Sequence, residues 1–537
     1  MKRLILILTT VLLCACAAPA DDEHHHEDMT PEQLGTVHFP TSCVIQVQAQ
    51  FERGVALLHS FWYEEAEKQF NQIIQEDSRC AMAHWGVAMS LWHQLWNRPD
   101  AATLKRGEAE IKEAKSLHAA TDRERGYIAA LGEFYAKPGK RDHQQRAYAY
   151  SQAMKRLHLR HPDDHEAAAF YALSVMASDS DKFPDSAARK KDAIAVLEKL
   201  FAEEPDHPGA AHYLIHIYDT PEMAAQGLPA ARRYAQIAPA SPHALHMPSH
   251  IFARLGLWQD DINSNLASIA ATRKTAEMHM GGEGHQFHAM DFLVYAYLQS
   301  GREAEARRVI DEVKAMPAMK DMYGEGFDPH IAALVWFEAS YALELHHWAE
   351  AAALQPVPGA GVADNAITYR ARAVGAVRAG DMAGARKDLA EIERIHQQLV
   401  DEKKNDRAKA VEGDRQIAEA WIDCGEGKND EALKLMRAVG DKDDGVHESS
   451  DGIPAREMLG DMLMEMKRPQ EALTEYEVDL KMNPNRFDGL AGAARAAEQA
   501  GKADKANEYY AKLVADCAGS NSERPELERA KKLVARK

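Results

Sequence analysis

The sequence predicts an all-α chain in which antiparallel helix pairs repeat along a curved superhelix. From about residue 44 onward the apolar residues follow helical spacing, and no alternating run of useful strand length appears. Ala472 and Tyr476 recur as Ala506 and Tyr510, which is a step of 34 residues. A period of this length is typical of stacked helical hairpins, because a single hairpin cannot bury its apolar face alone.

Length and charge exclude several classes of protein. The chain has 537 residues, with 64 Lys and Arg against 83 Asp and Glu and a formal charge of −19. This length allows several ordinary domains or one long repeat array, and either buries a sizeable core. An acidic chain lacks the basic surface that neutralises phosphates, so we expect no nucleic acid among its partners.

The N-terminus has the pattern of an export signal. Two basic residues precede an apolar run of about ten residues, half the length that a membrane-spanning helix needs. The segment LCAC at 13–16 resembles the lipobox of bacterial lipoproteins. This resemblance implies a signal peptide at residues 1–15, lipidation of Cys16, and a location in the cell envelope, on the periplasmic side or at the outer membrane, with the lipid as the only membrane contact. Plain secretion after cleavage near Ala18 or Ala20 is the alternative.

Four further segments follow along the chain. Residues 16–43 are polar, acidic and rich in histidine, so we expect a flexible tether. Residues 44–355 and 362–520 are predicted as two repeat arrays, separated by a stretch rich in Pro and Gly, and residues 521–537 as a capping helix. A segment rich in Asp and Ser at 178–186 interrupts the helices of the first array.

The cysteines that follow the signal are few. In an oxidising compartment, Cys43 and Cys80 are the first choice for a disulfide because they flank one predicted helical unit. Cys424 and Cys517 lie far apart in the sequence and are equally well explained as buried thiols.

The repeated pattern resembles the tetratricopeptide (TPR) signature, in which a small residue lets two helices approach and a bulky residue four positions later fills the gap. With segments such as HYLIHIYD and HMPSHIFARLGLW, the chain is similar to exported bacterial TPR lipoproteins of a largely uncharacterised, histidine-rich type. The resemblance implies a right-handed superhelix whose concave groove binds a partner protein or a peptide.

Histidines gather in one part of the chain and follow the repeat. Nine of the 26 lie between residues 207 and 288. His212 and His216 are four residues apart, and His246 and His250 repeat this pair 34 residues later. Side chains four residues apart share one face of a helix. We therefore expect the four imidazoles to converge in the groove as the ligands of a metal ion.

Further ligands are predicted from the same register. The second choices are Asp291, His243, His285, His288 and Glu166. Imidazole and carboxylate ligands suit Cu, Zn or Fe. The alternative is that the histidines bind no metal and are satisfied by hydrogen bonds or by the carboxylate of a peptide. Pro248 lies inside the second pair, and we expect it to start or kink a helix there.

Two functions follow from this pattern. The first is a lipid-anchored scaffold that docks a partner in its groove, where the metal ion is structural or is the cargo. The second is a metal-dependent enzyme, a hydrolase or an oxidase, with Glu166 or Asp291 as base or ligand and Tyr295 as proton donor. A helical zinc peptidase is disfavoured, because Tyr213 and Met247 stand where HExxH has its glutamate. No catalytic residue is assigned.

Overall fold

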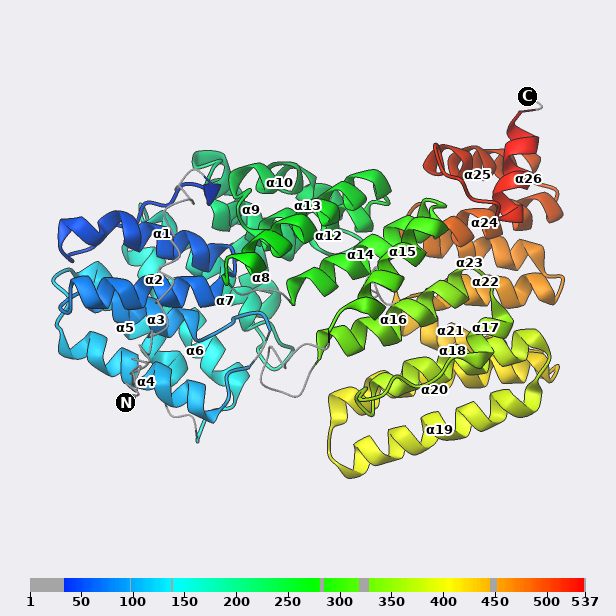
Figure 1. Ribbon diagram of the computed structural model, residues 1–537, viewed down its shortest axis with the longest axis horizontal. Coiled ribbons are helices and arrows are strands. Elements are labelled where there is room, and N and C mark those ends of the chain that lie inside the picture. The colour runs from blue at the N-terminus through cyan, green and yellow to red at the C-terminus, as the bar shows by residue number, and fades with distance from the viewer. Residues whose placement is uncertain are drawn as a thin grey trace, which may run out of the picture.

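The computed structural model describes residues 33–96, 98–136, 139–280, 284–317, 328–444 and 452–535. Cys16, the predicted signal peptide and most of the predicted tether lie outside these residues. The described residues are helical hairpins joined by short turns, and they contain no strand. Figure 1 shows the hairpins stacked side by side along the molecule. The predicted fold class, an all-α superhelix of TPR type, is confirmed.

The first part of the array begins with a 3-10 turn and continues through six hairpins. In chain order the elements are η3 (Ile45–Val47), α1 (Gln48–His59), α2 (Tyr63–Glu76), α3 (Ala81–Ser90), α4 (Ala101–Ser116), α5 (Asp122–Tyr135), α6 (His143–Arg160), α7 (His165–Ala177), α8 (Ser186–Glu203), α9 (Pro208–Tyr218), α10 (Ala224–Ile237), α11 (Pro242–His246), α12 (Pro248–Arg254) and α13 (Trp258–Glu277). In the sixth hairpin, α11 and α12 together form the first arm, and both pack against α13.

The second part continues without a change of architecture. Its elements are α14 (His285–Gln299), α15 (Glu303–Ala315), α16 (Pro329–Glu344), α17 (Trp348–Ala353), α18 (Asp364–Ala379), α19 (Met382–Asp401), α20 (Asn405–Gly425), α21 (Asn429–Asp443), α22 (Ala455–Glu465), α23 (Pro469–Met482), α24 (Phe487–Gln499), α25 (Ala503–Asp516) and α26 (Pro525–Val534). The segment 356–361, where we predicted a boundary between arrays, joins α17 to α18, and these two helices pack against each other. The capping helix predicted at 521–537 corresponds to α26, which packs on α25.

The residues before α1 differ from the predicted tether. Leu34 and Phe39 are fully buried in the first hydrophobic core. The backbone N–H of Thr36 donates to the carbonyl of Asp206 at 3.0 Å. Residues 33–43 therefore belong to the folded body, because their apolar side chains fill a space beside α1 and α9. The structure also joins Cys43 to Cys80, the first-choice pair, by a disulfide that ties this segment to the start of α3.

A proline divides the first arm of the sixth hairpin. Pro248 occupies the first position of α12, directly after α11 and Met247. Proline has no N–H to donate, so the helical hydrogen-bond ladder is interrupted there. Met247 nevertheless keeps helical backbone angles, φ −50° and ψ −35°. The two short helices therefore follow each other closely, and His246 and His250 stay on the same side.

The end of the chain returns to the middle of the array. The indole N–H of Trp258 donates to the carbonyl of Asn485 at 2.9 Å, and the backbone N–H of Phe487 donates to Gln299 at 2.9 Å. Helix α24 consequently contacts α14. In Figure 1, α22 to α24 lie next to α15 and α16, and α25 and α26 lie beyond α24 at the upper right. The second part of the array is thus folded back by the contact of α24 with α14, in which Phe487 and Gln299 are 188 residues apart in the sequence.

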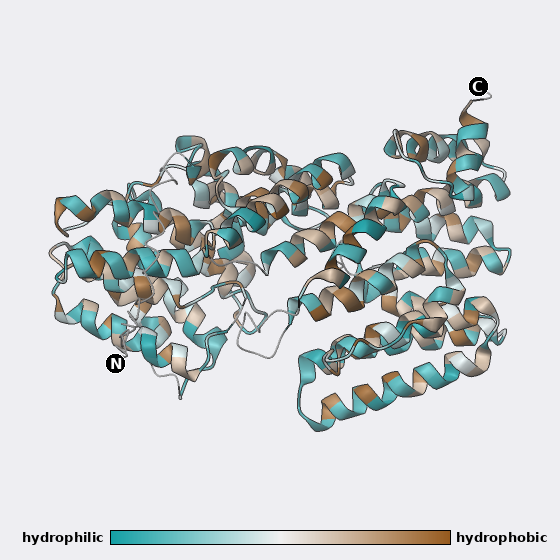
Figure 2. Ribbon diagram, viewed as in Figure 1, coloured by the Kyte–Doolittle hydropathy of each residue, from teal (hydrophilic) through white to brown (hydrophobic). Residues whose placement is uncertain are grey.

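Most helices carry both hydrophilic and hydrophobic residues (Figure 2). This is the pattern of helices that bury one face against neighbours and expose the other. Within the described part of the chain, no helix is long and apolar enough to cross a membrane.

Candidate metal centre

Helices α9, α11, α12 and α14 bring seven histidines together. They are His212 and His216 on α9, His243 and His246 on α11, His250 on α12, and His285 and His288 on α14. Six of them form two groups, in each of which the ligand nitrogens lie within 4.8 Å of one another. We name His212, His216 and His243 the inner group, and His246, His250 and His288 the outer group. The predicted set of four is therefore divided between two groups, and each predicted pair gains a third histidine from a neighbouring element.

The outer group has a fixed proton arrangement. The Nδ1 of His246 lies 2.7 Å from Oδ1 of Asn265, and the Nδ1 of His250 lies 2.9 Å from Oδ2 of Asp219. Both partners are oxygen acceptors, because the Asn265 amide group is already turned toward Asp261 and donates to it at 2.7 Å. Each Nδ1 therefore carries the proton. When both rings are neutral, the Nε2 atoms of His246 and His250, 3.1 Å apart, are two lone pairs that face each other.

This arrangement is unfavourable without a cation between or beside the two nitrogens. Metal-bound histidines characteristically donate their second ring N–H to a carboxylate or amide oxygen, which fixes the tautomer and orients the ring. Asp219 also accepts from Arg254 at 2.8 Å. Burial raises the pKa of Asp219, but hydrogen bonding to His250 and the nearby Arg254 outweigh it and lower that pKa, so this carboxylate is ionised.

In the inner group, His212 is oriented in the same way, through a hydrogen bond from its Nδ1. The Nδ1 of His212 donates to the carbonyl of His59 at 2.6 Å, which leaves its Nε2 as a lone pair 3.0 Å from the Nε2 of His243. The Nε2 of His216 is buried and has no hydrogen-bond partner. A buried unpartnered nitrogen beside two other imidazoles indicates a missing ligand.

Burial holds five imidazoles of the two groups, those of His212, His216, His243, His246 and His288, in the neutral form. Burial, followed by the neighbouring histidines, lowers the pKa of His212, His243 and His246 well below the ordinary value. Burial, followed by His250, lowers the pKa of His216 and of His288 to about 3. Neutral imidazole is the form that binds metal ions, so no proton has to be released at neutral pH.

Aromatic side chains cover the inner group, while the outer group opens to solvent. The ring of Phe61, in the turn between α1 and α2, lies 4.3 Å from the ring of His212 and 5.5 Å from that of His243. Trp96 lies 5.7 Å from His243. His288, in contrast, is exposed. The outer group is therefore the more exposed of the two, although His216 of the inner group is also partly exposed.

Glu166 belongs to a different cluster. Its two carboxylate oxygens lie 2.7 Å from Nε2 of His59 and 3.1 Å from Nε2 of His207, and all three side chains are buried. His207 Nδ1 accepts the backbone N–H of Ala210, so its Nε2 carries a proton and donates to Glu166. Although these three residues also have metal-ligand spacing, both oxygens of Glu166 are already hydrogen-bonded. The insertion at 178–186 separates Glu166 from the register of the later repeats.

The remaining predicted residues lie at the margins. The ring of His285 is 5.4 Å from that of His243, next to the inner group. The hydroxyl of Tyr295 accepts a hydrogen bond from Arg486 at 2.9 Å. Tyr295 therefore does not act as the predicted proton donor to the two groups. Asp291 adds to burial in raising the pKa of Asp261. Among the described residues, no group with metal-ligand spacing contains Asp291.

Sequence reasoning missed the residues that hold the histidines. Asp219, Asn265 and the carbonyl of His59 come from three different elements and share no motif with the histidine pairs. Asp219 directly follows α9 and lies three residues after His216. Its position beside a histidine pair is the only sequence signal that could have drawn attention to it.

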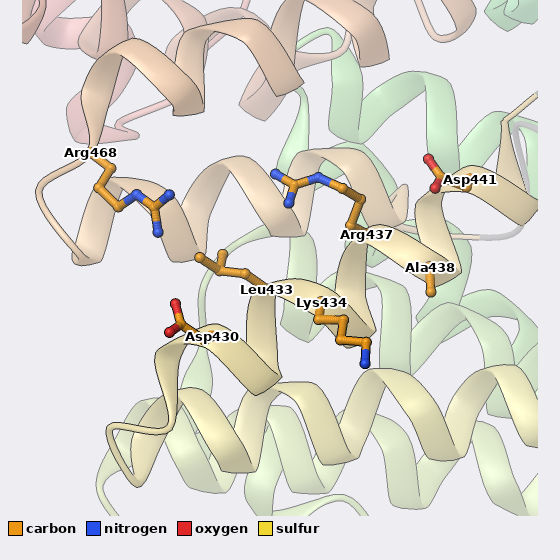
Figure 3. Close-up of a pocket in the computed structure, with 7 residues that line it drawn as sticks. All are labelled: Asp430, Leu433, Lys434, Arg437, Ala438, Asp441 and Arg468. Atoms are coloured by element: carbon orange, nitrogen blue, oxygen red, sulfur yellow. The ribbon is translucent and has the colours of Figure 1, made fainter.

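A separate cleft of about 330 Å³ lies on the outer face of α21 (Figure 3). Arg437 and Arg468 line it. Arg437 donates to Glu475 at 2.9 Å and Arg468 donates to Glu471 at 2.7 Å. Because both guanidinium groups already have carboxylate partners, this cleft does not resemble an anion site.

Comparisons with known proteins give matches among solved structures. No protein-family model matches it, and no curated protein is significantly similar in sequence. Among solved structures, a monomeric mutant of IFIT1 with Gppp-AAAA is 12% identical over 85% of this chain and 94% of that one, with a TM-score of 0.36. The human IFIT1 dimer with m7Gppp-AAAA is 12% identical over 89% and 95%, with a TM-score of 0.34. The Gppp-AAAA and m7Gppp-AAAA molecules in those titles are ligands of IFIT1.

Proposed function

We propose that this protein is an exported, lipid-anchored TPR-type scaffold of the cell envelope that binds a transition-metal ion at the outer group. The observation that carries the proposal is the pair of Nε2 lone pairs of His246 and His250, 3.1 Å apart, with each Nδ1 committed to an oxygen acceptor. His288 supplies the third nitrogen. Three imidazoles suit Cu, Zn or Fe, and copper heads the usual affinity order.

The anchor and the partner complete the proposal. The lipobox-like segment that ends at Cys16 supports attachment to a membrane through a lipid alone. The TPR-type architecture supports docking of a partner protein or peptide in the groove. The net charge of −19 favours a partner other than nucleic acid.

The test is metal content after loading. The protein without residues 1–32 is incubated with Cu(II) or Zn(II), passed over a chelating resin and analysed for metal. The variant H288A changes an exposed side chain, so its fold is expected to remain intact, and circular dichroism checks this. We expect retained metal in the parent and at least one ion fewer per chain in H288A. The control is H161A/H165A, a pair with the same spacing outside every candidate metal group of the described residues. Equal metal retention in parent and H288A, or none in the parent, overturns the proposal.

A second candidate function is metal-dependent catalysis by a hydrolase or an oxidase. One observation favours it: the outer group offers three protein nitrogens and faces solvent at His288. Catalytic metal sites characteristically have three protein ligands and one exchangeable position, whereas structural sites are closed by four. Relaxation of solvent water protons by the Cu(II)-loaded protein tests this candidate. Enhanced relaxation shows an exchangeable water, and its absence excludes an open site.

A further inference from the structure

We propose that the inner group binds a second transition-metal ion beside the first, so that the groove holds a pair of ions with a shared oxygen ligand. This inference rests on the proposed metal site at the outer group. The ligands of the second ion are His212, His216 and His243.

The first argument is that His212 is oriented by a hydrogen bond while Nε2 of His216 has no hydrogen-bond partner. The carbonyl of His59 accepts the Nδ1 proton of His212 and thereby turns its Nε2 toward His243. A hydrogen bond from His243 to His212 would satisfy those two rings but leaves His216 Nε2 buried without a partner. A metal ion satisfies all three nitrogens at once. Three imidazoles from two elements, α9 and α11, then form a half-open coordination shell.

The two groups are direct neighbours. The ring centroids of His216 and His250 are 6.3 Å apart, and those of His243 and His246 are 6.4 Å apart. A metal ion lies about 2 Å from each imidazole nitrogen that binds it. Ligands separated in this way fit two ions about 3.5 to 4 Å apart, the spacing at which two ions share one bridging oxygen.

The charges around the groups indicate what the bridge must be. All six ligands are imidazoles, which bind metal ions in the uncharged form, and the carboxylate next to them, Asp219, is paired with Arg254. Two divalent ions in a partly buried site repel each other and need an anion between them. Hydroxide from solvent meets this need, because binding to a metal ion strongly lowers the pKa of water. The rings of Phe61 and Trp96 pack against His212 and His243 on the inner side.

Copper loading and electron paramagnetic resonance test the pair. The wild-type protein without residues 1–32 is loaded with excess Cu(II) and passed over a chelating resin. We expect two copper ions per chain, and a spectrum that is weakened or broadened by coupling between them. Two variants are compared with the wild type. H216A removes a ring whose Nε2 makes no hydrogen bond, and H288A removes an exposed ring. Both variants are therefore expected to fold. Each should retain one copper ion and show the full, uncoupled signal of an isolated Cu(II) site.

The other outcomes separate the two proposals. One copper ion per wild-type chain, lost in H288A but retained in H216A, overturns the second site and leaves the outer site standing. Two ions with uncoupled spectra overturn the pair, because the ions then share no bridge. No retained copper in the wild type overturns both proposals. The H161A/H165A control should match the wild type in copper content and in spectrum.

Discussion

At the scale of single residues, the histidines of the inner and outer groups depend on the side chains and carbonyls that orient them. His250 is oriented by Asp219, which is itself held by Arg254. A carboxylate behind a metal-bound imidazole fixes its tautomer and makes it a stronger ligand, and its loss typically costs 10 to 100-fold in affinity.

Replacing Asp219 therefore tests the outer site with its ligands intact. We expect D219N to bind copper at the outer group about 10 to 100-fold more weakly, without changing the inner group. Competition against a chelator of known affinity measures both sites. The control D206N removes a surface carboxylate that pairs with Arg233. An unchanged affinity in D219N would show that the His250 to Asp219 contact has no part in metal binding.

A histidine outside the inner and outer groups makes the free energy of unfolding depend on pH. His143 begins α6, and burial, followed by the charges of Arg98 and Arg146, lowers its pKa to about 4. The unfolded chain has the ordinary value of about 6.5. Between pH 6.5 and pH 4 the unfolded state consequently binds a proton that the folded state does not, and stability falls as the pH is lowered through this window.

The variant H143Q should lack this part of the acid sensitivity. Between pH 7 and pH 5 we expect the wild type to lose up to about 1 kcal/mol more of its free energy of unfolding than H143Q, after allowance for solvent screening of a partly exposed ring. Urea unfolding at the two pH values measures the difference. Equal losses in both proteins would mean that His143 titrates normally in the folded state.

At the scale of elements, small residues let neighbouring helices approach a bulky one. Tyr476 on α23 is fully buried, and its hydroxyl donates to Asp461 at 2.6 Å. A Cβ at Gly492 on α24 would lie 2.4 Å from the ring, and one at Gly460 on α22 would lie 2.7 Å from it. The small-and-bulky pattern of the sequence is therefore a contact between consecutive hairpins, and not only within one of them.

The substitution G492A tests this contact. Alanine favours a helix by about 1 kcal/mol over glycine, but overpacking against Tyr476 costs about 1 to 3 kcal/mol, so we expect a net loss of stability. The matched control is G413A in α20, where a Cβ meets nothing within 4 Å and a gain of up to about 1 kcal/mol is expected. Urea unfolding compares the two. Stabilisation of both variants would show that the ring of Tyr476 moves aside at no cost.

At the scale of the whole molecule, one arginine joins the two ends of the second part of the array. Arg486 is fully buried and donates to both oxygens of Glu457 on α22, to Glu344 on α16 at 2.7 Å, and to Tyr295 on α14 at 2.9 Å. The contacts with Glu344 and Tyr295 attach the start of α24 to helices that precede it by more than a hundred residues.

Removal of Arg486 should loosen this closure. R486M leaves two buried carboxylates without their counter-charge, and we expect a loss of about 3 to 5 kcal/mol. The result to look for is a lower urea midpoint together with faster proteolysis of α22 to α26. The control R468M removes a surface arginine paired with Glu471 and is expected to change stability by about 0.5 kcal/mol or less. A normal midpoint in R486M would mean that apolar packing alone holds the C-terminal hairpins.

The sequence by itself determined the helical hairpins, their period, and the concentration of histidines on α9, α11 and α12. These features are local, because helix formation and the spacing of His212 from His216 depend on residues within a turn or two of one another. The pairing of Cys43 with Cys80 was also accessible, since both flank one hairpin.

Only the tertiary structure decided how the histidines are divided, what orients them and how the array ends. The inner and outer groups depend on the rotation of α9, α11 and α14 about their axes, and a period in the sequence does not set these angles. Glu166 does not join the other predicted ligands, because it is hydrogen-bonded to His59 and His207, which come from other hairpins. The contact of α24 with α14 likewise joins residues far apart in the sequence, since Phe487 and Gln299 are separated by 188 positions. This contact depends on the curvature that many stacked hairpins produce together, and no single repeat encodes that curvature.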